Sequence, residues 1–183
     1  MRRKNFILIM VGFVFSLCFT FSCQDKKAMA ELEAMKAQAE VEEQNKALVQ
    51  RILEEGDKSG ATILDEVCTS DYKMYFPSNA EPINLEEHKE LWQAFIVAFP
   101  DLTHRIDEFI AEGDMVSTRE TLSGTHKGEF QGIPPTGKKF EFSAICIWRF
   151  SDGRLAEYWS DGDILGLMMQ LGMELKPKVE KDI

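Results

Sequence analysis

The fold is decided by residues 125–172, which read THKGEFQGIPPTGKKFEFSAICIWRFSDGRLAEYWSDGDILGLMMQLG. Apolar and other residues alternate from Phe140 to Phe150 and again from Leu155 to Trp159, as expected of strands with one buried face. Ser151-Asp152-Gly153 lies between the two runs and supplies a turn whose glycine can adopt positive φ. An apolar segment from Asp163 to Gly172 follows, which predicts a closing helix that ends at the glycine. This stretch therefore predicts a long β-hairpin followed by a C-terminal helix.

The preceding chain predicts helices first and strands afterwards. A helical apolar face is expected to end at Gly56, and a third helix is expected to begin at the capping-box-like Asn84-Leu85-Glu86-Glu87 and to stop at Pro100. In chain order, the expected elements are helices over 45–56 and 61–67, a strand over 71–76, a helix over 84–99, and strands over 102–111 and 115–125. Helices that cover one face of a curved antiparallel sheet make an α+β domain.

Several ordered blocks resemble the SnoaL-like polyketide cyclase (ester cyclase) family. They are Ala98-Phe99-Pro100-Asp101-Leu102, Glu112-Gly113-Asp114, Gly124-Thr125-His126-Lys127-Gly128, Gly132-Ile133-Pro134-Pro135-Thr136-Gly137 and Asp152-Gly153, extended by Glu157, Trp159, Asp163 and residues 165–172. The resemblance covers about residues 45–172. It implies the cone-shaped fold of ketosteroid isomerase and nuclear transport factor two, with a pocket between the sheet and the helices.

Alternation along the hairpin sorts its side chains onto two faces. Phe142, Cys146 and Trp148 share the face that we expect to line the pocket, and Arg149 belongs to the other. On the second strand, Tyr158 and Ser160 are expected to point inward and Leu155 outward. The candidate ligand-binding residues are Tyr75, Phe142, Cys146, Trp148, Tyr158 and Ser160.

The resemblance also implies where catalysis would reside, and here the sequence departs from the family. As the blocks align, the family's catalytic His falls on Cys146 and its acid/base Asp falls on Ser160. An aldol-type ring closure needs a base for a proton next to a carbonyl and an acid for the new oxyanion. A serine without a base beside it and a buried thiol supply neither. The family's cyclase mechanism therefore does not transfer residue by residue.

Two other residues could carry acid–base chemistry. Asp163 matches a family Asp, although it could instead cap the closing helix. His126 belongs to the Thr-His-x-Gly block, although it could instead order the Pro134-Pro135 loop. Tyr75 and Tyr158 could donate hydrogen bonds to a ligand carbonyl, or could be core aromatics.

The N-terminus resembles a bacterial lipoprotein signal. Arg2-Arg3-Lys4 is basic, and the uncharged apolar run from Phe6 to Phe21 is shorter than the ~20 residues of a spanning helix. Thr20-Phe21-Ser22-Cys23 resembles the cleavage box, except that Leu is usual at the position of Thr20. Lipidation at Cys23 is the favoured interpretation, and secretion without lipid or an uncleaved anchor are the alternatives. These features predict a protein of the bacterial cell envelope, lipid-anchored to a membrane.

The expected division of the chain is a signal peptide over 1–22, a charged helical tether over 23–44, a SnoaL-like domain over 45–173 and a C-terminal tail over 174–183. The net charge is −10, and it becomes −13 when the three basic residues of the signal are removed, since the signal contains no acid. Such a surface argues against nucleic acid and against electrostatic docking on an anionic bilayer. The histidines and cysteines lack metal-ligand spacing, and we expect no metal and no cofactor.

Two functions remain open. The first is a lipoprotein that binds a small apolar molecule and has lost the family's catalysis, and the second is a cyclase-, isomerase- or hydrolase-type acid–base enzyme that uses Asp163, His126 or a pocket tyrosine. A homodimer paired through the open face of the sheet is a further possibility.

Overall fold

The computed structural model describes residues 2–77 and 80–176, and the side chains from residue 25 onward. The chain divides into two compact units, Met1–Val41 and Glu42–Ile183. Helix α1 (Arg2–Ser59) supplies the first unit and continues into the second. The side chains of the signal segment 1–22 and of Cys23 lie outside the described residues. Within the part of the chain whose side chains are described, no helix is long and apolar enough to cross a membrane.

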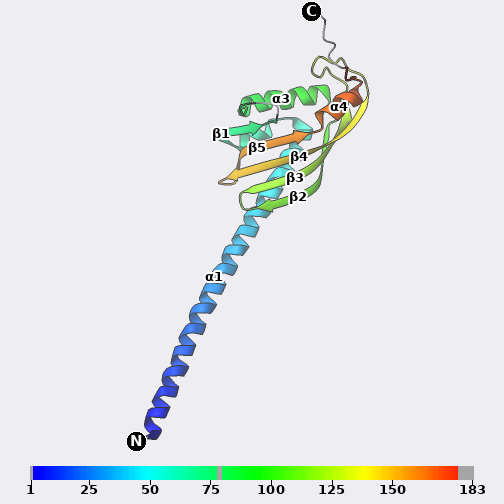
Figure 1. Ribbon diagram of the computed structural model, residues 1–183. Coiled ribbons are helices and arrows are strands. Elements are labelled where there is room, and N and C mark those ends of the chain that lie inside the picture. Colours follow the sequence, from blue (N-terminus) through cyan, green and yellow to red (C-terminus); the bar gives the residue numbers. More distant parts are fainter. Residues whose placement is uncertain (1, 78–79, 177–183) are drawn as a thin grey trace, which may run out of the picture. The chain divides into compact units, whose positions relative to one another are not determined.

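The second unit is an α+β domain, as the sequence predicts (Figure 1). Its remaining elements are α2 (Ile63–Val67), β1 (Cys68–Tyr75), α3 (Leu85–Ala98), β2 (Thr103–Glu112), β3 (Met115–Thr125), β4 (Lys139–Ser151), β5 (Arg154–Gly162) and α4 (Ile164–Leu171). The strands form one curved sheet in the order β1-β5-β4-β3-β2.

The sheet is mixed rather than purely antiparallel. Strands β2 to β5 form an antiparallel meander, but β1 pairs with β5 in parallel, with Met74 opposite Tyr158. A parallel pair requires a crossover rather than a tight turn. Here the chain from β1 to β5 passes through α3 and the whole meander, so local sequence patterns do not reveal the pairing.

The inward face of β4 is the one expected from alternation. Phe142, Cys146 and Trp148 are buried, whereas Ser143 and Ile145 point outward and are exposed. The expected outward position of Leu155 is wrong, because Leu155 and Tyr158 are both buried. Their shared direction follows from a register shift, in which Arg149 pairs with Glu157 while Phe150 pairs with Leu155. The extra residue of this bulge breaks the alternation of β5.

The helix ends follow their local signals, with one exception. Asn84 and Glu87 form a complete capping box at the start of α3, and Gly172 ends α4 with φ of 110°. The predicted stop at Gly56 is wrong, because α1 continues to Ser59 and Gly60 then turns at φ of 74°. Gly56 instead lies under the Trp92 ring, since a Cβ at this position would lie 2.2 Å from Cζ2 of that ring. The glycine is needed for close packing inside the helix rather than for a turn.

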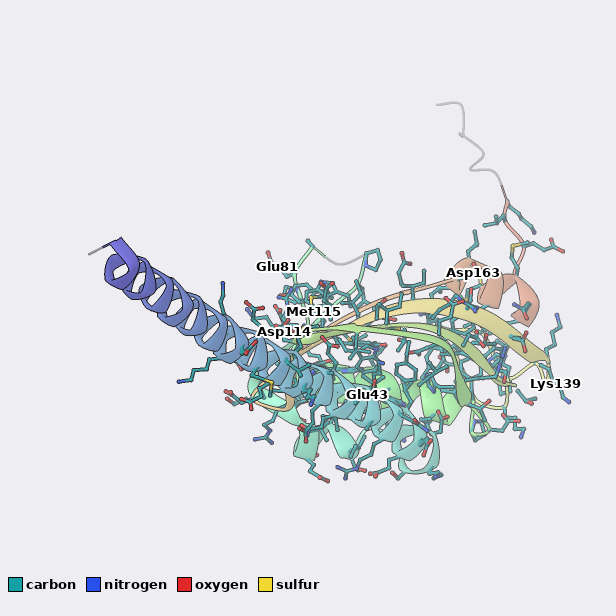
Figure 2. The ribbon with its side chains drawn as sticks, turned by 90° about the horizontal axis from the view of Figure 1, so that it is seen from below. Glu43, Glu81, Asp114, Met115, Lys139 and Asp163 are labelled. Atoms are coloured by element: carbon teal, nitrogen blue, oxygen red, sulfur yellow. The ribbon has the colours of Figure 1, made fainter. Side chains whose placement is uncertain are left out.

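The C-terminal half of α1, α2 and α3 pack against the inward sheet face to form one core. Val49, Ile52 and Leu64 from the helices meet Trp148 and Leu155 from the sheet, and all five are nearly inaccessible. The turn between β2 and β3 is tied to α1, because Gly113 N donates to Glu42 Oε1 and its carbonyl accepts from Asn45 Nδ2. Figure 2 shows Asp114 and Met115 beside this turn, at the opposite end of the sheet from Lys139 and Asp163.

Candidate ligand site

A cavity of about 760 Å³ opens between α3 and the inward face of the sheet. This volume lies within the range of small-molecule sites. Its walls are mainly apolar and come from α1, α3 and all five strands. The lining residues include Leu53, Met74, Phe76, Ile83, Leu91, Trp92, Phe95, Leu102, Leu122, Phe130, Phe142, Ala144, Trp148 and Tyr158, together with the polar Glu87, His88, His104, Gln131, Ser160 and Asp161.

Four of the candidate ligand-binding residues line this cavity: Phe142, Trp148, Tyr158 and Ser160. Cys146 lies just behind the wall, where Tyr158 donates to its sulfur over 3.2 Å. Tyr75 is not brought to the cavity. It stacks on Trp159 at 4.9 Å and donates to Glu157, and these side chains occupy the opposite face of the sheet.

Cys146 and Ser160 are directly opposite each other in the β4–β5 ladder, with Sγ and Oγ 3.7 Å apart. Burial raises the pKa of the Cys146 thiol to about 12, so the sulfur remains protonated near neutral pH. Burial also raises the pKa of the Tyr158 phenol. These three groups can donate or accept hydrogen bonds, but near neutral pH none of them is an effective base.

The two catalytic candidates from the sequence lie outside the cavity wall. Asp163 is an exposed N-cap of α4, and its Oδ1 accepts from Gly166 N at 2.8 Å (Figure 2). His126 is fully buried, and its Nδ1 accepts from the backbone of Thr136 in the loop that contains Pro134 and Pro135. The alternative interpretations, helix capping and loop ordering, describe the observed contacts of both residues.

Two other histidines line the cavity, and the sequence did not single them out for catalysis. His88 on α3 is stacked among Tyr72, Trp92 and Tyr158, and its Nδ1 lies 2.9 Å from the Tyr72 hydroxyl. Burial lowers the pKa of His88 to about 4, so this imidazole is neutral near pH 7. Its position on an amphipathic helix gave no sign of this aromatic surrounding.

His104 at the start of β2 is paired with Asp57 near the end of α1. Its Nδ1 lies 2.6 Å from Asp57 Oδ1, and its backbone N donates to Asp57 Oδ2 at 2.8 Å. Both side chains are mostly buried, at 10% and 16% exposure. The residues are 47 positions apart in the chain, so no local motif signals the pair.

A buried carboxyl group lies behind the same wall. Glu120 on β3 is 1% exposed, and the Thr118 hydroxyl donates to its Oε1. Trp148 Nε1 in turn donates to Thr118. Burial raises the pKa of Glu120, although the hydrogen bond from Thr118 acts in the opposite direction. Among the described residues, no group of three His, Cys, Asp or Glu side chains is placed to hold a metal ion.

Comparisons with known proteins all point to one family, the SnoaL-like polyketide cyclases. A sequence model of the SnoaL-like polyketide cyclase family matches residues 46–171. The aklanonic acid methyl ester cyclase DnrD of Streptomyces peucetius is 33% identical over 76 residues, which is 41% of this chain and 52% of that protein. The nogalonic acid methyl ester cyclase of Streptomyces nogalater is 32% identical over 37% of this chain and 48% of that protein. The chain thus spans about half the length of the curated relatives it matches.

Solved structures give broader coverage. AclR of Streptomyces galilaeus, a proposed hydroxylase, is 28% identical with a TM-score of 0.68, over 75% of this chain and 87% of that one. IdmH of Streptomyces antibioticus, a proposed polyketide cyclase, is 30% identical with a TM-score of 0.63, over 70% of this chain and 99% of that one. Different chemistries are thus assigned to neighbours that share this fold, so the residues of the cavity must decide the function.

Proposed function

Because the chain belongs to the SnoaL-like polyketide cyclase family, we propose that it binds a small, mainly apolar molecule in the cavity between α3 and the sheet. The observation that carries the proposal is the cavity itself, about 760 Å³ with walls formed largely by aromatic and aliphatic side chains. An apolar ligand is favoured there because burying its surface releases water at about 25 cal/mol per Å². The few polar groups on the wall would orient the ligand.

The departures at Cys146 and Ser160 support binding without the family's usual ring closure. In the resemblance described above, these positions correspond to the family's catalytic His and Asp. A protonated thiol and a serine hydroxyl cannot replace that pair as base and acid. The curated relatives are named as cyclases of aklanonic acid methyl ester and nogalonic acid methyl ester. A largely apolar ring system is accordingly the class of ligand that we propose.

We also propose that Cys23 carries lipid and holds the domain in the bacterial envelope. The basic residues 2–4, the apolar run and the small Ser22 before Cys23 support this proposal. Acyl chains contribute about 0.8 kcal/mol per buried CH₂, so two or three chains anchor a protein firmly. The Cys23→Ala variant should move from the detergent phase to the aqueous phase of a Triton X-114 partition, with an unchanged melting temperature. A wild-type protein found in the aqueous phase would contradict lipidation.

The binding proposal can be tested with the uncharged fluorophore N-phenyl-naphthylamine, which brightens in apolar sites. Ser160→Phe places a ring in the cavity from its wall, and we expect it to weaken binding at least tenfold. Ser143→Phe is the matched control, because Ser143 lies exposed on the outward face of β4. Equal binding by all three proteins, or no binding by the wild type, would count against the cavity as the ligand site.

A further inference from the structure

The strongest feature that the binding proposal leaves unused is the Asp57–His104 pair on the cavity wall. Asp57 Oδ1 lies 2.6 Å from His104 Nδ1, and an ionised carboxylate only accepts hydrogen bonds. The proton of the neutral imidazole is therefore on Nδ1, and the lone pair is on Nε2. Among the described residues, none forms a hydrogen bond with Nε2, and His104 belongs to the cavity lining.

A purely structural role explains only half of this geometry. The hydrogen bond from the backbone N of His104 to Asp57 Oδ2 joins the end of α1 to the start of β2. That bond would be equally good with any residue other than proline at position 104. The second oxygen of the same carboxylate adds a bond to the ring, which fixes both its orientation and its tautomer. An imidazole held in this way is a prepared proton acceptor.

A second imidazole of the cavity, His88, has the opposite character, that of a hydrogen-bond donor. The Trp92 ring packs against both imidazoles, with centroid distances of 5.7 Å to His88 and 6.3 Å to His104. The buried Tyr72 hydroxyl, 2.9 Å from His88 Nδ1, can donate to that nitrogen, which leaves the proton of the neutral ring on Nε2. A neutral imidazole N–H can donate to a carbonyl oxygen that gains negative charge. Two histidines of different character thus border one apolar cavity.

We infer that His104, oriented by Asp57, is a general base that removes a proton from a carbon next to a carbonyl group of the bound molecule. This inference rests on the proposed binding function and adds chemistry to it. The proton moves to His104 Nε2, the C–H electron pair forms a carbon–carbon double bond, and the carbonyl π pair moves to oxygen. The result is an enolate and an imidazolium beside the Asp57 carboxylate. Return of a proton to the carbon completes the exchange, with no oxidant or reductant involved.

The site is distinct from the hairpin positions that the resemblance associates with catalysis. Cys146 and Ser160 belong to β4 and β5, whereas Asp57 and His104 belong to α1 and β2. The apolar wall matters to the chemistry, since attraction between the new imidazolium and Asp57 is stronger where water is excluded. The substrate class is an apolar ring ketone or ester with an acidic C–H.

The test uses β-tetralone, an apolar bicyclic ketone, with the full-length protein in D₂O. Proton NMR follows the loss of its α-hydrogen signals, and calorimetry measures its binding separately. We expect exchange well above that of buffer containing the same concentration of free imidazole. The His104→Gln variant should bind β-tetralone as the wild type does, while exchange falls by about 10²–10⁴-fold.

Asp57→Asn provides a second variant. Its amide can still accept from the backbone N of His104, but its NH₂ would donate to Nδ1 and move the ring proton to Nε2. Exchange should therefore fall while binding remains, as when the Asp of a catalytic triad is changed to Asn. Asp163→Asn is the matched control outside the cavity, because Asn also caps a helix, and it should change neither quantity.

The outcomes separate the two proposals. Binding of β-tetralone by the wild type without exchange would overturn the assignment of His104 and leave the binding function intact. Absence of binding would count against the binding function itself. Exchange that survives in His104→Gln, or that disappears in a folded Asp163→Asn, would place the base elsewhere and overturn the inference.

Discussion

Acidification should weaken the fold through His88, and the size of this effect follows from its surroundings. The side chain is 5% exposed, and burial lowers the pKa of His88 from 6.5 to about 4. The folded protein therefore resists protonation, whereas the unfolded chain takes up a proton below about pH 6.5. Stability from this group is complete above pH 6.5, is lost as the pH falls towards 4, and levels off below that.

The magnitude comes from the same shift. One pKa unit corresponds to about 1.36 kcal/mol, so the difference between pH 7 and pH 4 amounts to about 3 kcal/mol for His88 alone. Other groups also titrate, and the raised pKa of Glu120 acts in the opposite direction, since it favours the folded state at low pH. A comparison with the His88→Phe variant removes these contributions, because both proteins contain them.

The assay is urea unfolding followed by tryptophan fluorescence at several pH values from 7 to 4. Phenylalanine keeps the stacked packing between Tyr72, Trp92 and Tyr158 but does not titrate. We expect the wild type to lose about 3 kcal/mol more than His88→Phe over this range. Parallel pH profiles for the two proteins would show that His88 titrates normally and would refute its assignment as a neutral imidazole.

Two further predictions concern packing, and both are measured by chemical denaturation. Trp148→Ala should lower the free energy of unfolding by about 3–5 kcal/mol, because the indole is 1% exposed. Ile145→Ala should lower it by under about 1 kcal/mol, because Ile145 is 58% exposed on the outward face of β4. Similar losses would mean that the two faces of β4 are wrongly assigned. Gly128→Ala should lower the free energy of unfolding by about 1–3 kcal/mol, because a Cβ there would lie 2.3 Å from the Val97 carbonyl oxygen. Gly132→Ala is the control for loop glycines. Its added Cβ meets open space, although the backbone has a positive φ of 80°. A Gly128→Ala variant as stable as the wild type would contradict this account of the contact with Val97.

Local signals in the sequence predicted the elements that depend on neighbouring residues. The alternation from Phe140 to Phe150 correctly assigned the inward face of β4, and Asn84 correctly marked the start of α3. Asp163 and Gly172 correctly bounded the closing helix. These features are set within one or two turns of the chain, where residue spacing and capping chemistry act directly.

Features set by distant residues could not be predicted in the same way. The parallel β1–β5 pairing, the bulge that turns Leu155 inward and the continuation of α1 past Gly56 all depend on partners far along the chain. In the sequence, Gly56 predicts the end of a helix. Only the structure shows that the glycine is there because the Trp92 ring packs against it.

The polar groups of the cavity show the same limit. A lone histidine in a strand and an aspartate at the end of a helix carry no signal of their 2.6 Å contact. The resemblance directed attention to Cys146 and Ser160 on the hairpin, because that is where the family carries its acid and base. The histidines on α3 and β2 become candidates only when the fold brings them to one wall.

The most direct test of the central proposal, that the cavity holds a small apolar molecule, is native mass spectrometry of protein purified from its own host. We expect the wild-type protein to carry a stoichiometric added mass that organic solvent extracts, and Ser160→Phe, purified in the same way, to lack it. Ser143→Phe should retain the added mass. A wild-type protein with no bound molecule, or an identical bound mass in Ser160→Phe, would contradict the proposal that this cavity is the binding site.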